Sequence, residues 1–165
     1  MPGQNESRLG SRSNPVPLGQ TVEFIERNYG KEQRIRLTLT EYAWGEDAER
    51  IRNAEESYIR YGAHEGRIYV LAHFQAEYVE GPADETWSVA HHDDFKAEAH
   101  NVMVGVFINS WDGALRGVAY PGGVLSGWIA FEVPKGTEPS EVRVVYDPSW
   151  RAYDTEVWFS LTPPQ

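Results

Sequence analysis

The residues with the clearest capacity for chemistry are four consecutive side chains, His91, His92, Asp93 and Asp94. Imidazole nitrogens and carboxylate oxygens bind zinc, copper and nickel, and a further histidine elsewhere in the chain could supply a third ligand. Neighbouring side chains of an extended segment point to opposite faces, so His91 and His92 reach one metal only if the segment turns. A metal site at these four residues is therefore one hypothesis, and an ordinary polar loop is the other.

The same four residues lie in the most acidic part of the chain. Between residues 76 and 100, seven carboxylates stand against one lysine, a net charge of −6. Calcium takes several oxygen ligands, which loops supply readily, so segment 84–100 is where a calcium ion would bind. No Asp-x-Asp-x-Asp-Gly pattern occurs, and scattered carboxylates are usually exposed to solvent. Our first expectation is no cofactor, with calcium as the alternative.

The chain is also rich in aromatic residues, with six tryptophans and nine tyrosines. Trp87, Trp111, Trp128 and Trp150 fall at predicted strand ends, in loops, or on the polar side of a strand. Clustered exposed aromatic rings mark binding surfaces, and flat rings stack on sugars, so these four tryptophans predict a carbohydrate-binding surface if they are exposed. The alternative is that they fill the core of a two-sheet protein and cap its ends.

The composition excludes several other classes of function. A net charge of −10 and a pI near 4.9 have the wrong sign for binding nucleic acid or anionic membranes. The absence of cysteine excludes thiol catalysis, disulfides and cysteine-based metal centres. Ser126 lacks the glycine two residues before it that a nucleophile turn requires, and 25 acidic residues make carboxylate pairs uninformative about glycosidase chemistry. We therefore expect a protein that is not an enzyme.

Alternation with period two dominates from Gln20 onward, and turn residues interrupt it at short intervals. This pattern predicts about eight half-buried strands in an antiparallel sandwich or barrel. Runs 67–78 and 102–108 carry apolar residues on both faces and are predicted to be central strands. Tyr42 and Trp44 break the alternation of run 34–40, which predicts a bulge. One short helix near 46–57 competes with a charged loop.

The first twenty residues differ in composition from the rest, being rich in proline, glycine, serine, asparagine and glutamine. Such a segment is typical of a flexible tether. We predict a leader or linker over 1–19 and a single domain over 20–162.

Several motifs along the domain resemble a known bacterial family. They are GGVLSGWIAFEVPKG at 122–136, then EVRVVYDPSW and EVWFSL, with LGQTVEF at 18–24 and EGRIYVLAHFQAEY from 65 onward. They resemble extracellular immunoglobulin-like domains of unknown function, of the lipoprotein type and related in fold to the immunogenic secreted protein of mycobacteria. The motifs mark turns and strand starts, and none is catalytic.

The resemblance implies an immunoglobulin-like β-sandwich that is extracellular or anchored at the cell surface, with the leader as a stalk and a native N-terminal membrane anchor trimmed away. The chain departs from the family over 83–100, where features particular to this protein are expected. We predict a non-catalytic extracytoplasmic binding module that contacts a protein or cell-envelope component through a sheet face or the acidic loop. The alternatives are a carbohydrate-binding module, and a metal-dependent enzyme or calcium-binding domain that uses residues 84–100.

Overall fold

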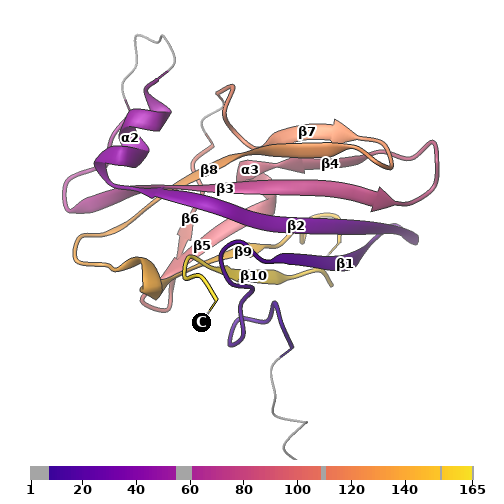
Figure 1. The fold of residues 1–165 in the computed structure, drawn as a ribbon, viewed down its shortest axis with the longest axis horizontal. Helices are drawn as coiled ribbons and strands as arrows, with labels where there is room; N and C mark the ends of the chain where they lie inside the picture. The colour runs from indigo at the N-terminus through magenta and orange to yellow at the C-terminus, as the bar shows by residue number, and fades with distance from the viewer. Residues whose placement is uncertain (1–7, 55–60, 109–110, 153, 165) are drawn as a thin grey trace, which may run out of the picture.

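The computed structural model describes residues 8–54, 61–108, 111–152 and 154–164 of the chain. In these residues ten strands form two four-stranded sheets and one two-stranded sheet, all with antiparallel pairing between neighbouring strands (Figure 1). The predicted all-β antiparallel sandwich is therefore confirmed.

The first sheet has the order β1-β2-β3-β8, with bounds Thr21–Asn28, Lys31–Trp44, Arg67–Glu80 and Val124–Pro134. Figure 1 looks onto its outer face, with β1 lowest and β8 above β3. Alternate residues of β2, including Ile35 and Leu37, are buried against the second sheet. The predicted bulge is present as a register shift between Leu39 and Glu41 in the pairing of β2 with β3. The shift turns Tyr42 toward the core.

The outer face of this sheet is apolar at one end and polar over the rest. At the apolar end, Ala43, Leu71 and Ala130 are buried beneath α2 (Glu46–Arg52), whose Ala48 and Ile51 pack in the same cluster. This helix was predicted, although it ends at Arg52, and residues 55–60 lie outside the described part of the chain. Because α2 covers only one end, the polar remainder of the face stays open.

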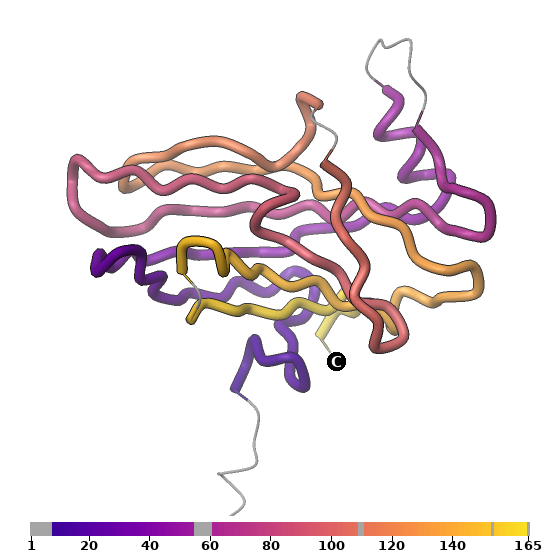
Figure 2. Tube along the Cα trace, turned by 180° about the vertical axis from the view of Figure 1, so that it is seen from behind, coloured from indigo at the N-terminus to yellow at the C-terminus, as the bar shows by residue number. Residues whose placement is uncertain are grey.

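The second sheet has the order β10-β9-β5-β6, with bounds Val157–Ser160, Val142–Tyr146, Phe95–Ala99 and Val102–Gly105. It lies in front in Figure 2, which views the molecule from behind. The two sheets meet through aromatic rings, since Phe74 of β3 lies 4.8 Å from Phe95 and 5.1 Å from Phe159 between ring centroids. The prediction of a central strand over 102–108 is wrong, because β6 is an edge strand that ends at Gly105.

The prediction of a loop over 84–100 is also wrong for most of the segment, although a weak strand expected around 94–97 is present as β5. Residues 87–99 form β4 (Trp87–Ala90), the one-turn helix α3 (His91–Asp94) and β5, and β4 pairs with β7 (Arg116–Ala119). Small or aromatic residues alternate with the charged ones here, so that Val89, Ala97 and Ala99 are buried. β4 and β7 have four residues each, which is too short an alternation to be recognised, so neither strand was predicted.

The N-terminal boundary at residue 20 also needs correction. Val16 is fully buried, its amide donates to Trp158 O at 2.8 Å, and the amide of Ser160 donates to Val16 O at 2.9 Å. Proline has no backbone N–H to donate, but the amides that pair with the β10 segment belong to Val16 and Leu18, which alternate with the prolines at 15 and 17. Residues 10–18 are thus part of the sandwich rather than a tether. The 3-10 turn at Pro139–Glu141 leads into β9.

Candidate functional site

A groove of about 700 Å³ follows the free edge of β1. Its walls come from three segments of the chain, residues 8–12, residues 22–27 of β1 and residues 154–158. Successive residues of a strand point to opposite faces, yet Val22, Glu23, Phe24 and Ile25 all line this space. The hollow therefore runs along the edge of the strand, and we call it the β1-edge groove.

The two strands that border the groove differ in how their edges are covered. The edge of β10 is occupied by the N-terminal segment, which exchanges backbone hydrogen bonds with Trp158 through Gly10 and Val16. β1 pairs only with β2, and no backbone hydrogen bond from a described residue reaches its other edge. In an antiparallel pair every second residue directs its N–H and C=O groups away from the partner strand. The groove thus presents backbone donors and acceptors that could extend the sheet.

The side chains of the groove give it an apolar floor and a charged rim. Val22 and Phe24 are half-buried against the core, and the Phe24 ring lies 5.7 Å from that of Tyr146. Ile25, on the outer side of β1, is 39% exposed. The rim carries exposed charges of both signs, from Arg8, Arg27, Asp154 and Glu156. Such a surface suits a chain that brings both apolar and polar side chains.

A buried ionic cluster holds the inner side of β1 to the rest of the sandwich. Arg151 donates through Nε to Glu26 Oε2 at 3.2 Å and through Nη1 to Asp94 Oδ1 at 2.7 Å, and all three residues are buried. Glu26 also accepts hydrogen bonds from Trp87 Nε1 at 3.2 Å and from the hydroxyl of Tyr146. Burial, together with the neighbouring Glu26 carboxylate, raises the pKa of Tyr146 well above its usual value, so this phenol stays protonated. The cluster fixes the position of β1 and offers no open space for a substrate.

A second ionic cluster ties the N-terminal segment to the second sheet. Glu98 of β5 accepts from Arg12 Nε at 2.7 Å and from Arg143 Nη1 at 2.9 Å. Burial by itself would raise the pKa of Glu98, but hydrogen bonds and charge from the two arginines outweigh it and lower this pKa. Residues 8–12, which form one wall of the groove, are therefore held in place by an ion pair.

The four residues predicted to bind a metal are not brought together as a ligand set. His91 is buried with its Nε2 at 3.3 Å from Ile108 O, and Asp94 accepts from Arg151, Trp150 Nε1 and the amide of Ala90. α3 does turn the segment, so the rings of His91 and His92 lie 4.8 Å apart. Even so, no group of three or more histidine and carboxylate side chains among the described residues is placed to hold a metal ion.

The four predicted tryptophans separate into three environments. Trp87 is only 1% exposed and donates to Glu26, so its predicted place on a binding surface is wrong. Trp150 is 61% exposed but stands apart, with its indole nitrogen donating to Asp94 at 2.9 Å. Trp111 and Trp128 are half-buried and pack against the same apolar cluster on the outer face of the first sheet. Only this last pair shares a surface.

The residues of the β1-edge groove were not identified from the sequence, and of the buried cluster only Asp94 and Trp87 were singled out, for other roles. Glu26 lies on the same parity as the inward-facing Val22 and Phe24, which is a signal that a buried carboxylate was present. Its partners Asp94 and Arg151 are far away in the sequence, and nothing in their local context indicates that they meet. An unpaired strand edge likewise depends on which strands are neighbours, which alternation does not reveal.

No protein-family model and no curated protein matches the chain. Among solved structures, a secreted protein of Mycobacterium tuberculosis, MPT63, superimposes with a TM-score of 0.56 at 11% identity, over 90% of this chain and 98% of its own. The yjhA protein of Bacillus subtilis gives 0.56 at 14% identity, over 88% of this chain and 98% of that chain. The putative lipoprotein ycdA of Bacillus subtilis also gives 0.56, at 11% identity over 85% of this chain.

These similarities show the fold. The chain has the β-sandwich architecture of secreted and lipoprotein-type bacterial proteins, as the sequence resemblance predicted. It spans only 38% of the length of the putative lipoprotein. None of the three descriptions assigns a reaction or a ligand. Within the described residues, no helix has the length and apolar character needed to cross a membrane.

Proposed function

We propose that this chain is a non-catalytic, extracytoplasmic binding domain that takes up an extended polypeptide segment of a partner protein along β1. The observation that carries the proposal is the combination of an unpaired eight-residue edge strand with a groove of about 700 Å³ beside it. A bound segment would add a strand to the first sheet, with its main chain pairing to the free backbone groups of β1. Its side chains would contact the apolar floor and the charged rim.

The length of β1 and the rigid walls of the groove support this choice over the free edge of the second sheet. The other edge strand of the first sheet, β8, already makes backbone hydrogen bonds with Phe107, Gly113 and Leu115. The β1 strand is eight residues long, whereas the free edge strand of the second sheet, β6, has four residues. At about 3.4 Å per residue, β1 offers roughly 27 Å of backbone for pairing. The buried cluster around Arg151 and the ion pair at Glu98 fix both walls, so little ordering is needed when a segment binds.

The extracytoplasmic and non-catalytic parts of the proposal rest on separate support. The structural neighbours include a secreted protein and a putative lipoprotein, which favours a place outside the cytoplasm. The buried carboxylates of the two ionic clusters, Glu26, Asp94 and Glu98, are each paired with an arginine. A catalytic group must instead reach a substrate, so these clusters favour a structural role.

The test is selection of a phage-displayed random dodecapeptide library on the whole chain. Recovered peptides are then synthesised, and their affinity is measured by fluorescence anisotropy for the unmodified protein and for two variants. Ile25→Ser removes an apolar side chain from the β1-edge groove, and Val102→Ser makes a comparable change at the exposed edge strand β6. Partial burial of an isoleucine side chain corresponds to a loss of about threefold to tenfold in affinity.

We expect Ile25→Ser to weaken binding by this factor and Val102→Ser to leave it unchanged. Failure to recover any binding peptide would contradict the proposal. Equal affinity for the unmodified protein and Ile25→Ser, or a greater loss with Val102→Ser, would place the binding surface elsewhere and also reject it.

A further inference from the structure

The open part of the first sheet's outer face carries a row of uncharged polar side chains that crosses all four strands. The row has one residue from each strand, and each residue is the register partner of the next: Thr21, Thr38, Gln75 and Ser126. Thr21 and Thr38 share a hydrogen bond of 2.7 Å between their hydroxyls, and the side chains of Gln75 and Ser126 have no hydrogen-bond partner among the described residues. Three strand spacings of about 4.8 Å make this row roughly 14 Å long.

Two shallow hollows lie along this row, one over its first three residues and one at its last. One, of about 360 Å³, is lined by Thr21, Arg36, Thr38, Gln75 and Glu77. The other, of about 410 Å³, is lined by Trp111, Asp112, Ala114, Arg116 and Ser126. Gln75 belongs to the first and Ser126 to the second, and these two residues are paired on neighbouring strands. We call the combined surface the cross-strand trough.

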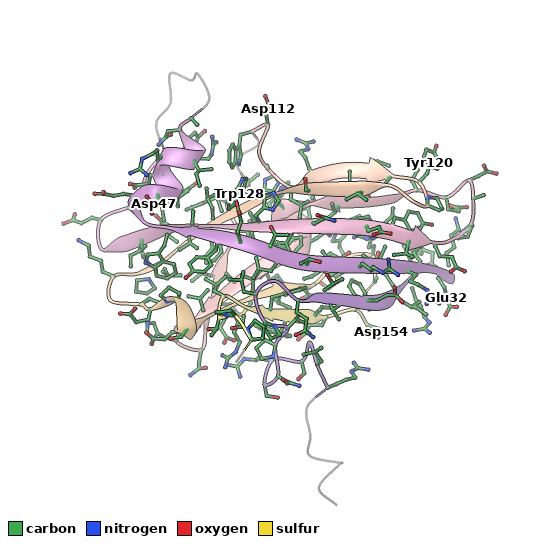
Figure 3. The ribbon with its side chains drawn as sticks, viewed as in Figure 1. Glu32, Asp47, Asp112, Tyr120, Trp128 and Asp154 are labelled. Carbon is green, nitrogen blue, oxygen red and sulfur yellow. The ribbon has the colours of Figure 1, made fainter. Side chains whose placement is uncertain are left out.

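Aromatic side chains border the trough on the side toward α2. The ring of Trp128 meets that of His73 edge to face at 4.9 Å between centroids, and His73 Nδ1 lies 2.6 Å from the hydroxyl of Thr40. Trp111 packs against the same apolar cluster as Trp128 and lines the second hollow. Figure 3 places Trp128 near the middle of the sheet, with Asp112 on the loop above it. The indoles thus adjoin the polar row, and both are partly exposed.

The trough is electrically balanced although the chain is not. Its lining contains two arginines, at 36 and 116, and two carboxylates, at 77 and 112, whereas the whole chain has a net charge of −10. Arg36 is paired with Glu23 at 2.8 Å and lies 3.6 Å from Glu77. A phosphorylated or nucleic-acid ligand would need an excess of positive charge, which this surface does not have.

From these features we infer that the cross-strand trough binds a neutral oligosaccharide. Threonine and serine hydroxyls and the glutamine amide each donate and accept hydrogen bonds, which matches the hydroxyl groups of a sugar. The partly exposed indoles supply flat apolar surface for the C–H face of a sugar ring, with an N–H donor at the edge. A few polar groups beside aromatic side chains are the usual composition of a small-ligand site. This site is separate from the β1-edge groove and does not depend on it.

The test uses isothermal titration calorimetry of the whole chain with four neutral hexasaccharides, built from glucose, xylose, mannose and N-acetylglucosamine. Hexagalacturonate serves as the anionic probe. The variants Gln75→Ala and Ser126→Ala alter exposed side chains of the trough, so the fold should tolerate both changes. Ser88→Ala on β4 is the control for the serine, and Tyr120→Ala is the control for an exposed aromatic outside the trough.

We expect at least one neutral hexasaccharide to bind and Gln75→Ala to weaken it about fivefold, the effect of losing one hydrogen bond. Ser88→Ala and Tyr120→Ala should leave the affinity unchanged. Trp128→Phe retains an aromatic ring but loses ring area and the indole N–H, so it should weaken binding more than Gln75→Ala does. Lack of binding by all four neutral probes would overturn the inference. Preference for hexagalacturonate, or unchanged affinity in both Gln75→Ala and Ser126→Ala, would overturn it as well.

Discussion

Replacing Arg151 by methionine removes the positive charge that lies between two buried carboxylates. Arg151 donates to Glu26, to Asp94 and, through Nη2 at 2.9 Å, to the hydroxyl of Tyr146. Methionine fills much of the same volume but supplies no donor. Glu26 and Asp94 would then keep only neutral donors such as Trp87 and the amide of Ala90.

The size of the effect follows from the burial of the three groups. The side chains of Arg151, Glu26 and Asp94 are 4%, 0% and 1% exposed, so water does not replace the lost arginine. Removing one member of such a buried ion pair costs about 3–5 kcal/mol, because the remaining charge is left uncompensated. For a chain of this length that is a fall in Tm of roughly 6–20 °C.

The assay is urea unfolding followed by tryptophan fluorescence, with Arg143→Met as the matched control. Arg143 pairs with Glu98 but is itself 34% exposed, and Glu98 keeps Arg12, so this control should lose about 1 kcal/mol or less. Arg151→Lys, which keeps the charge but not the planar fork, should fall between the two and gives a folded variant if Arg151→Met does not fold. If Arg151→Met costs less than about 1 kcal/mol, or no more than the control, then Arg151 does not compensate the buried carboxylates.

Three further results are expected. Burial lowers the pKa of His91, so its contribution to the free energy of unfolding is complete above the ordinary histidine pKa of about 6.5 and is lost as pH falls below it. In urea unfolding, the free energy of unfolding should therefore fall less between pH 7.5 and pH 5.5 for His91→Gln than for the unmodified protein, and an equal fall would contradict this. Val16→Ala should lower the free energy of unfolding by about 2 kcal/mol, while Leu9→Ala, at an exposed position, should change it very little. Equal effects of the two changes in thermal unfolding would contradict the inclusion of residues 10–18 in the sandwich. A methyl group at Gly127 would lie 2.6 Å from the backbone of Leu115, so Gly127→Ala should cost about 1–3 kcal/mol, whereas Gly105→Ala, in open space, should not destabilise the protein. Calorimetry in which Gly105→Ala is destabilised as much as Gly127→Ala would contradict the close packing of β8 against the segment before β7.

Long alternating runs were sufficient to predict most of the fold. β2, β3 and β8 have eleven or more residues each, and their alternation identified the core faces and the bulge near Leu39. The run over 102–108 failed because apolar residues on both faces do not distinguish a central strand from an exposed edge. Val102 is 63% exposed at the end of the second sheet. Burial there depends on sheet order, which is a tertiary property.

The candidate sites depended even more on tertiary structure. Composition directed attention to segment 84–100 for its charge, yet Asp94 and Glu98 are buried there as partners of arginines distant in the sequence. Of the predicted tryptophans, Trp111 and Trp128 do share a surface, which borders the cross-strand trough. The pattern of side chains could not predict the free edge of β1, because the groups that would bind there belong to the main chain.

The most direct test of strand addition at β1 is amide hydrogen exchange, measured residue by residue by NMR, with and without a selected dodecapeptide. Only every second amide of β1 faces its free edge, so exchange should slow at alternate residues between Thr21 and Asn28, with no change in β6. Protection confined to β6 or to the outer face of the first sheet, or none in β1 at saturating peptide, would contradict it.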